Sequence, residues 1–386
     1  MIKKVIDKFN IEGEFKGIKE NNSGNINNTY IASFVDDNGD ENKYLIQKIN
    51  TTVFTEPYKL MKNIEGVTSY LKKQIKKEHD TQHKVLEVVR TKDNQLLCYI
   101  EENGEGDYYR IYDYIENAIS YDCSVDLDIV FNTGQAFGNF QKLLRNYPIS
   151  SLTETIKDFH STDIRFERLL RDIKIDSQGR VAEVAPEIVF LLKRADDFSA
   201  ITKLLGTEEV PYRVTHNDTK VNNVLMNKDT GNFLAVIDLD TVMPGSLLFD
   251  YGDGVRSTAS SAKEDETDLS KVFLDLELFK AYTDGYLSEM APFITETELS
   301  LMGASIRLIA IELGMRFLND YINGDTYFKT NYPKHNLDRV RNQQALVLDI
   351  EKNMDFINNY IYESYYRYKD VNKNKGRVLT SNKQTV

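Results

Sequence analysis

The stretch from Tyr212 to Asp240 holds one of the five histidines of the chain, four aspartates and two adjacent asparagines, and its pattern constrains the local fold. Its sequence, YRVTHNDTKVNNVLMNKDTGNFLAVIDLD, alternates apolar, β-prone runs with two segments rich in Asn, Asp and Gly. This alternation predicts the order strand, loop, strand, tight turn, strand, with Gly231 in the tight turn, where a positive φ is easy. Antiparallel segments of this length bring the loop beside the end of the last strand.

Three polar side chains fall on the two ends that this arrangement joins. Asp218 and Asn223 lie on the loop HNDTKVNN, and Asp238 ends the last strand, twenty positions after Asp218. Phosphoryl transfer needs such a set, because Mg²⁺ takes oxygen ligands and a separate carboxylate must accept the proton of the attacking hydroxyl. We predict Asp218 as the catalytic base and Asn223 and Asp238 as metal ligands. Asp240 is a second ligand or a supporting residue.

The alternative is a plain turn, because Asn and Asp side chains often bond to their own backbone. Taken singly, each of these residues fits a turn. The combined spacing His-x-Asp-x4-Asn, followed by an apolar strand that ends in Ile-Asp, favours the site over the turn.

The chain divides into a β-rich and a helical part. Up to about residue 115 the pattern indicates strands around one helix, in which Leu60, Ile64, Val67 and Leu71 have helical spacing. Beyond it helical patterns dominate, apart from the stretch described above. We therefore predict an α+β fold with a small β-rich lobe at 1–115, a large, mainly helical lobe at 116–372 and a polar tail at 373–386.

Composition excludes several classes of protein. The chain has 386 residues and a net charge of −12, which argues against nucleic acid or anionic membranes as partners, because both reward clustered Lys and Arg. No apolar run approaches the roughly 18 residues of a membrane span, and the N-terminus lacks the apolar segment of a secretory signal. Two cysteines are too few for a disulfide framework. We expect a cytoplasmic protein that acts on a small molecule, and the sequence does not indicate its oligomeric state.

The motif HNDTKVNN…VIDLD resembles the catalytic loop and metal-binding aspartate of the protein-kinase-like fold, in the branch that includes aminoglycoside phosphotransferases and choline kinase. DLD stands where protein kinases have DFG, which argues against a protein substrate. Four longer segments are similar to bacterial N-acetylhexosamine 1-kinases: THNDTKVNNVLMNKDTGNFLAVIDLDTVMPGSLLFDYGDGVRS, TIKDFHSTDIRF, RFLNDYINGDTYFK and HNLDRVRNQQAL. This resemblance implies phosphorylation of the anomeric hydroxyl of N-acetylglucosamine or N-acetylgalactosamine, with ATP and Mg²⁺ as cofactors.

The resemblance also implies a nucleotide site in the first part of the chain. The segment NNSGNINNTY stands where such kinases keep the loop over the ATP phosphates, although it has one glycine instead of three. Lys48 would pair with phosphate, with Glu65 on the following helix as its partner. The residues expected to contact ATP are Ser23, Gly24, Asn25, Asn28, Lys48, Glu65, Tyr114, Ile115 and Glu116.

The acceptor needs side chains that hold hydroxyl groups. Arg307 lies in an apolar helix, where a buried arginine needs a partner or a ligand. Arg316 and Asp320, at i and i+4, are expected to form an ion pair. The residues expected to contact the acceptor are Asp218, Lys220, Arg307 and His160.

Two further residues would hold the catalytic loop rather than react. In kinase-like proteins the motif histidine packs and bonds to keep the loop in shape, which is the role expected of His216. An aspartate just past the metal site holds the same loop, and Asp250 stands at that position.

Two rival functions stay open at this point. An aminoglycoside or choline-like O-phosphotransferase of the same fold is favoured by the acidic segment AKEDETD at 262–268, because cationic substrates need carboxylates. A non-catalytic pseudokinase that binds nucleotide or sugar would lack one of the three site residues, and all three are present.

Overall fold

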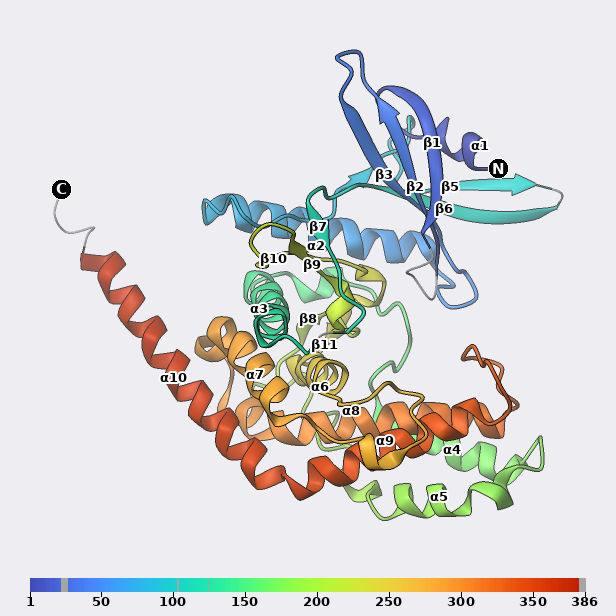
Figure 1. Cartoon of the computed structure of the whole chain (residues 1–386), viewed down its shortest axis with the longest axis vertical. Helices are drawn as coiled ribbons and strands as arrows, with labels where there is room; N and C mark the ends of the chain where they lie inside the picture. Colours follow the sequence, from blue (N-terminus) through green and yellow to red (C-terminus); the bar gives the residue numbers. More distant parts are fainter. Residues whose placement is uncertain (22–26, 103, 124, 382–386) are drawn as a thin grey trace.

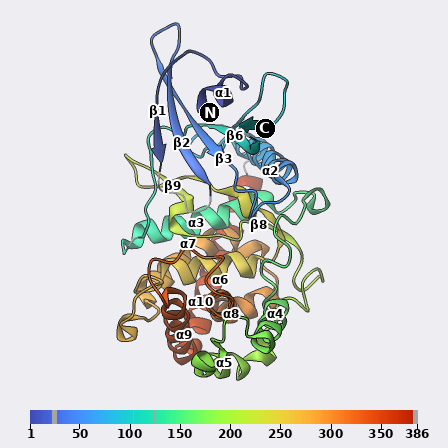
Figure 2. The same ribbon diagram turned by 90° about the vertical axis from the view of Figure 1, so that its right-hand side faces the viewer.

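A sheet near the N-terminus and a helical body make up the molecule (Figure 1). The computed structural model describes residues 1–21, 27–102, 104–123 and 125–381, with side chains up to residue 369. In the views of Figures 1 and 2 the sheet lies at one end and the helices at the other. The expected α+β organisation, with the strands first and the helices after them, is confirmed.

The N-terminal sheet is antiparallel, with the order β1-β2-β3-β6-β4, and β5 pairs with β6. Its strands are β1 (Glu14–Asn21), β2 (Asn28–Val35), β3 (Glu41–Lys48), β4 (Val88–Val89), β5 (Cys98–Glu102) and β6 (Glu105–Asp113), and the short helix α1 (Ile2–Ile6) precedes them. Strand residues alternate between two faces. The outer face packs Phe34, Ile46 and Ile111 with Val5 of α1. The inner face presents Leu45 and Tyr112 to a second apolar cluster.

Helix α2 (Pro57–Lys77) joins the sheet to the helical body. Its apolar residues Leu60, Ile64, Val67 and Leu71 are buried at the predicted helical spacing, and Pro57 occupies its first turn, where a missing N–H costs nothing. The same cluster contains Leu144 of α3 (Leu127–Leu144). The two parts of the chain therefore share a core along α2.

The predicted strand, loop, strand, turn, strand order is confirmed by β8 (Arg213–Thr215), β9 (Val224–Asn227) and β10 (Phe233–Val236). β9 and β10 form the tight antiparallel hairpin, and β7 (Ala118–Ile119) pairs with β9. β8 instead pairs with β11 (Met243–Gly245). This pairing brings the loop after β8 against the chain that follows β10.

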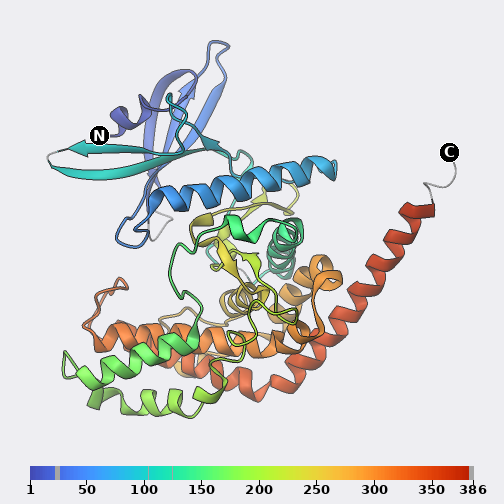
Figure 3. The same cartoon turned by 180° about the vertical axis from the view of Figure 1, so that it is seen from behind.

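The remaining helices form the body of the molecule, with α8 near its centre (Figure 1). They are α4 (Thr162–Ile175), α5 (Ala185–Leu192), α6 (Leu247–Thr258), α7 (Leu276–Met290), α8 (Glu296–Ile322), α9 (His335–Lys352) and α10 (Met354–Ser381). Short 3₁₀ segments are η1 (Ile149–Ser151), η2 (Val181–Val184), η3 (Ala195–Asp197), η4 (Val221–Asn223), η5 (Leu239–Thr241), η6 (Leu269–Lys271) and η7 (Ala291–Phe293). Figure 3 shows the end of α10 reaching away from the body.

Helices α3 and α7 pack unusually closely because glycines face each other. A Cβ on Gly285 would collide with the backbone oxygen of Phe131, and one on Gly134 would collide with that of Tyr282. Among the described residues, none of the helices is both long and apolar enough to cross a lipid bilayer.

Candidate active site

The loop after β8 is held in shape by Asp250, in the first turn of α6. Its two carboxylate oxygens accept the backbone N–H groups of His216 at 2.9 Å and Asn217 at 2.8 Å. Gln141 of α3 donates a third hydrogen bond at 2.5 Å. Asp250 is fully buried, which raises the pKa of its carboxyl group, and these donors offset part of the cost of burying its charge. The carboxylate therefore acts as the expected support of the loop.

His216 connects this loop to the turn after β10. Its Nε2 donates to the backbone oxygen of Ile237 at 2.8 Å, while Nδ1 accepts the backbone N–H of Asp218 at 3.3 Å. Thr241 donates through Oγ1 to the backbone oxygen of His216 at 2.6 Å. Because both ring nitrogens are engaged with backbone groups and the ring is buried, His216 is a structural residue and not a base.

Asp218 and Asn223 are adjacent in space. The Asn223 Nδ2 group donates to the backbone oxygen of Asp218 at 2.8 Å and to its Oδ2 at 3.1 Å. Lys220 Nζ lies 2.7 Å from the other carboxylate oxygen, and this carboxylate raises the pKa of Lys220. The Asp218 side chain keeps about a quarter of its surface exposed (27%), so a substrate can reach it.

Asp238 lies beside this group at the end of β10. Its backbone is left-handed, with φ at 58° and ψ at 60°, a region that non-glycine residues seldom adopt. The residue is open to solvent on one side, yet the surrounding protein and then the carboxylates of Asp240 and Asp218 raise its pKa to about 7. The cations Arg110 and Lys220 act on this pKa in the opposite direction.

This donor set fits Mg²⁺. With the Asn223 amide nitrogen donating to Asp218, its carbonyl oxygen is the atom left for a hard cation. Asp238 adds a carboxylate whose pKa is raised by the surrounding protein and then by the carboxylates of Asp240 and Asp218, and a divalent cation bound there would offset this cost of its negative charge. Within the described residues no three His, Cys, Asp or Glu side chains form a metal cluster, so the remaining ligands would come from water and phosphates.

Asp240 supports the site instead of offering a second metal ligand. Arg110 NH1 donates to its Oδ1 at 2.5 Å and NH2 to its Oδ2 at 2.9 Å. Asn27 Nδ2 donates to Oδ2 at 2.6 Å. With both oxygens occupied, the supporting role is the one that the structure favours. Arg110 is not among the site residues predicted from the sequence, and its signal there is a charged residue within the β-prone run YYRIYDYI.

Comparison with known proteins places the chain in a family. Residues 18–290 match the model of the Phosphotransferase enzyme family (APH). The chain belongs to this family. The match covers well over half of the sequence and includes the whole Asp218–Asp238 region.

Solved structures with the same fold are distant in sequence. A microcompartment-associated aminopropanol kinase is 14% identical with a TM-score of 0.58, covering 92% of this chain and 96% of its own. An amicoumacin kinase in complex with AMP-PNP and Ca²⁺ is 13% identical, with a TM-score of 0.57 and coverage of 91% and 92%. A spectinomycin phosphotransferase in complex with ADP is 11% identical, with a TM-score of 0.54 and coverage of 89% and 94%. These matches establish the protein-kinase-like fold of this phosphotransferase and leave its acceptor open.

The expected pairing of Lys48 with Glu65 is wrong in this phosphotransferase. Lys48 Nζ lies 2.7 Å from Asp107, and Glu65 pairs with Arg90. The reason is that side chains alternate between the two faces of a strand. Lys48 lies on the outer face with Ile46, whereas α2 packs against the inner face. Asn28 lies directly opposite Lys48 on β2 and is exposed on the same face.

Other expected nucleotide contacts remain predictions. Ser23, Gly24 and Asn25 lie outside the described residues. The residues after β6 are Tyr114, Ile115 and Glu116. The backbone N–H of Tyr114 already donates to the backbone oxygen of Lys43 at 3.1 Å. The carboxylate of Glu116 lies 3.2 Å from the Lys43 ammonium group. Ile115 packs against the apolar cluster along α2.

Among the described contacts, those of Arg307 are with Asp197 and Glu351 and not with the catalytic loop. Its guanidinium lies 2.5 Å from Asp197 and 3.8 Å from Glu351, so its partners are acidic side chains and not a ligand. The expected role as an acceptor contact is therefore not supported, and the physical reason is that α8 turns this position toward α9 and η3.

His160, by contrast, lies against the loop. Its Nδ1 is 2.9 Å from Glu312 of α8, and its Nε2 is 3.4 Å from the backbone oxygen of Asn217. Thr162 also donates to Glu312, at 2.7 Å. The side chain is buried and links α8 to the residue that precedes Asp218.

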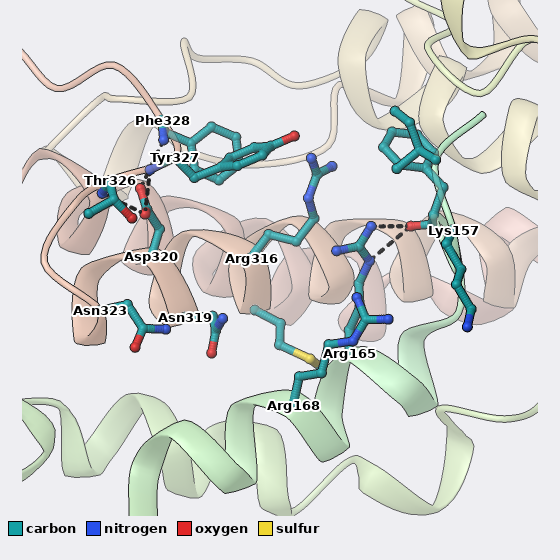
Figure 4. Close-up of a pocket in the computed structure, with 13 residues that line it drawn as sticks. Lys157, Arg165, Arg168, Arg316, Asn319, Asp320, Asn323, Thr326, Tyr327 and Phe328 are labelled. Atoms are coloured by element: carbon teal, nitrogen blue, oxygen red, sulfur yellow. Dashed lines mark hydrogen bonds between the residues drawn. The ribbon is translucent and has the colours of Figure 1, made fainter. Parts of the chain in front are cut away.

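A pocket of about 320 Å³ opens beside His160, between α4, α8 and the segment after α8 (Figure 4). Its centre is Arg316, whose guanidinium lies over the rings of Phe159, Tyr327 and Phe328 at 5.2, 5.9 and 5.5 Å. The expected ion pair with Asp320 is not formed. Asp320 instead accepts the backbone N–H groups of residues 326–328 at 2.8 to 2.9 Å.

The pocket is rich in positive charge. Arg165, Arg168, Arg316 and Lys157 line it, and Asp320 is the acidic residue among them. Burial is the main cause that lowers the pKa of Arg165 to about 10; Glu312 opposes this shift, and the guanidinium groups of Arg316 and Arg168 contribute to it. Among the described ion pairs none involves Arg316, so its donors are free for a ligand.

Proposed function

We propose that this phosphotransferase uses ATP and Mg²⁺ to phosphorylate the anomeric hydroxyl of an N-acetylhexosamine. The resemblance in four segments of the sequence suggests this acceptor. The observation that carries the proposal is the pocket around Arg316, joined to the catalytic loop through Glu312 and His160. Arg316 lies one helical turn, about 5.4 Å, along α8 from Glu312.

The lining of this pocket suits a neutral sugar derivative. Aromatic rings pack against the apolar faces of a ligand, and guanidinium groups donate to hydroxyl and carbonyl oxygens, such as the carbonyl of an N-acetyl group. An aminoglycoside or a choline-like acceptor would carry positive charge toward Arg316, which is unfavourable because Arg316, unlike Arg165 and Arg168, has no acidic partner among the described ion pairs. The same argument weighs against the amino-alcohol alternative.

The acidic segment that favoured a cationic acceptor is compensated by its own neighbours. Glu264 lies 3.0 Å from Arg256, and Asp265 lies 3.3 Å from His335. Glu266 lies 3.9 Å from Lys271. Paired carboxylates offer less attraction to a cationic ligand, so this segment no longer supports that alternative.

The proposed chemistry assigns separate tasks to the loop residues. Asp218 accepts the proton of the attacking hydroxyl and is oriented for this by Asn223 and Lys220. Lys220 also supplies positive charge near the transferring phosphoryl group. Asn223 and Asp238 would hold Mg²⁺, which neutralises charge on the ATP phosphates.

The test is an acceptor panel. The protein is incubated with ATP, Mg²⁺ and either N-acetylglucosamine, N-acetylgalactosamine, galacto-N-biose, choline or kanamycin, and ³¹P NMR locates the phosphate. A sugar 1-phosphate is the expected product. Phosphate on choline or kanamycin alone would contradict the proposal, and nucleotide binding without turnover on any acceptor would favour a pseudokinase.

A further inference from the structure

A row of polar side chains crosses the inner face of the N-terminal sheet. Thr29 on β2 is directly opposite Gln47 on β3, and Gln47 is directly opposite Arg110 on β6. Gln47 Nε2 donates to Thr29 Oγ1 at 3.1 Å, and Arg110 Nε donates to Gln47 Oε1 at 2.9 Å. Neighbouring strand residues point to opposite faces, so this row lies on the face away from Lys48.

The row ends in a buried ion pair with the metal-binding turn. Arg110 is only 1% exposed, and its two terminal nitrogens donate to both oxygens of Asp240. A paired fork of this kind fixes orientation as well as distance. The contact joins residues 130 positions apart and therefore ties the sheet to the turn that carries Asp238.

A second residue of the N-terminal part completes the contact. Asn27, at the end of the segment before β2, donates to Asp240 at 2.6 Å and accepts the backbone N–H of Asn50 at 3.0 Å. Asp240 is thus held from β6 and from the connection between β1 and β2. In this way the inner face of the sheet, opposite to the face that carries Lys48, contacts the metal-binding turn directly.

The turn needs such an anchor. Asp238 has a left-handed backbone, which costs a non-glycine residue free energy and persists only where the surroundings enforce it. Backbone hydrogen bonds hold the turn on one side, from Ile237 N–H to Asn223 at 2.9 Å. On the other side Thr241 is bonded to His216 and Asn217 of the catalytic loop, and the side chain of Asp240, two residues after Asp238, ties the turn to the sheet.

We propose that Arg110 is a positioning residue for metal binding. By holding Asp240 it fixes the turn that presents Asp238 beside Asp218. Lys48 on β3, which the resemblance implies as a phosphate contact, lies on the other face of the sheet and does not make this connection. This inference rests on the proposed kinase function only in requiring a metal–nucleotide site, and not on the identity of the acceptor.

The decisive variant is Arg110→Lys, which keeps the positive charge and loses the bidentate hydrogen bonding to Asp240. Mn²⁺ binding to the full chain in the presence of AMP-PNP, without any acceptor, is measured by electron paramagnetic resonance. Affinity for Mn²⁺ should fall at least about tenfold, as is typical when a residue that orients a ligand is changed. AMP-PNP binding without metal should change less than about threefold. Asp240→Asn should have a similar effect. The double variant should bind Mn²⁺ with an affinity no lower than that of either single variant.

Arg194→Lys is the matched control. Arg194 makes an equivalent fork to Glu351, at 2.8 and 2.6 Å, within the helical body. It should lower the melting temperature without weakening Mn²⁺ binding. If Arg110→Lys behaves like this control, Arg110 is purely structural and the proposal is wrong. A larger loss of Mn²⁺ affinity in Lys48→Met than in Arg110→Lys would also overturn it.

Two further outcomes keep the test informative. If Arg110→Lys does not fold, Gln47→Leu is measured instead, because it removes the hydrogen bond between Gln47 and Arg110. This variant should also lower the affinity for Mn²⁺. An unchanged affinity would overturn the proposal. If the wild type binds no Mn²⁺ with AMP-PNP, the metal site and this inference fail together. A normal Mn²⁺ effect without sugar turnover supports this inference while contradicting the proposed acceptor.

Discussion

Asn223 donates two hydrogen bonds to Asp218, one to its backbone oxygen at 2.8 Å and one to its carboxylate at 3.1 Å. Lys220 contacts the second carboxylate oxygen at 2.7 Å. The proposed base is therefore held from both sides, and the residue that holds it on one side is also the proposed amide ligand of the metal. Changes at these positions should separate chemistry from nucleotide binding.

The variant Asp218→Asn should abolish turnover while leaving ATP affinity nearly intact. It keeps the shape of the side chain and removes the group that accepts the proton, so kcat should fall by roughly 10² to 10⁴. Steady-state kinetics and calorimetric titration with AMP-PNP measure the two effects separately. A large loss of nucleotide binding would contradict the role assigned to Asp218.

The variant Arg316→Lys tests the acceptor pocket. A lysine cannot spread its charge over three rings, so the KM for the sugar should rise about tenfold while the KM for ATP stays within a factor of about two. Arg145→Lys is the control, because Arg145 also stacks on a ring, that of Phe293 at 4.7 Å, outside the pocket. Equal effects of the two variants would show that loss of stacking alone is responsible.

The two cysteines should differ sharply in reactivity. Burial raises the pKa of Cys98 to about 11, so the neutral thiol is favoured and only about one molecule in a thousand carries the thiolate at pH 8. Cys123 is exposed. Ellman's reagent at pH 8 should therefore titrate one thiol rapidly and the second only in denaturant.

The thiol of Cys98 should also respond to pH in a defined direction. Because its pKa is raised, its reactivity in the folded protein should grow as the pH increases toward 11, measured in the variant Cys123→Ser. Rapid labelling of Cys123→Ser at pH 7 would show that the site of Cys98 opens in solution.

The contact between α3 and α7 should not tolerate a side chain at Gly285. Gly285→Ala places a methyl group against the backbone oxygen of Phe131, so the free energy of unfolding should fall by about 1–3 kcal/mol. Urea denaturation measures the loss. Gly17→Ala is the control, because nothing lies within 4 Å of its added Cβ. A comparable loss in both variants would contradict the packing argument.

Local features of the fold were predictable from the sequence. The apolar residues of α2 and the strands β8, β9 and β10 follow periodicities that each segment carries by itself. The contact between Asp218 and Asn223 was also within reach, since the two residues are five positions apart around a short 3₁₀ segment. Short separations leave the chain few ways to keep such groups apart.

Charge pairing was not predictable in the same way. Arg316 and Asp320 have ideal helical spacing, yet backbone N–H groups of the following segment take the carboxylate. Lys48 and Gln47 are neighbours in the sequence, and only the register of β3 decides which of them faces the metal-binding turn. A shift of one residue would reverse the two faces.

The sequence by itself determined the order of the elements, the family and the spacing of the proposed base and metal ligands. Tertiary structure alone decided that Arg110 pairs with Asp240 and that Arg307 pairs with acidic side chains. It also decided that Arg316 lies against aromatic rings and not in an ion pair with Asp320. The physical reason is that a charged side chain pairs with whichever oppositely charged or polar group packing brings within about 3 Å. Packing joins residues more than a hundred positions apart, and no local pattern records those distances.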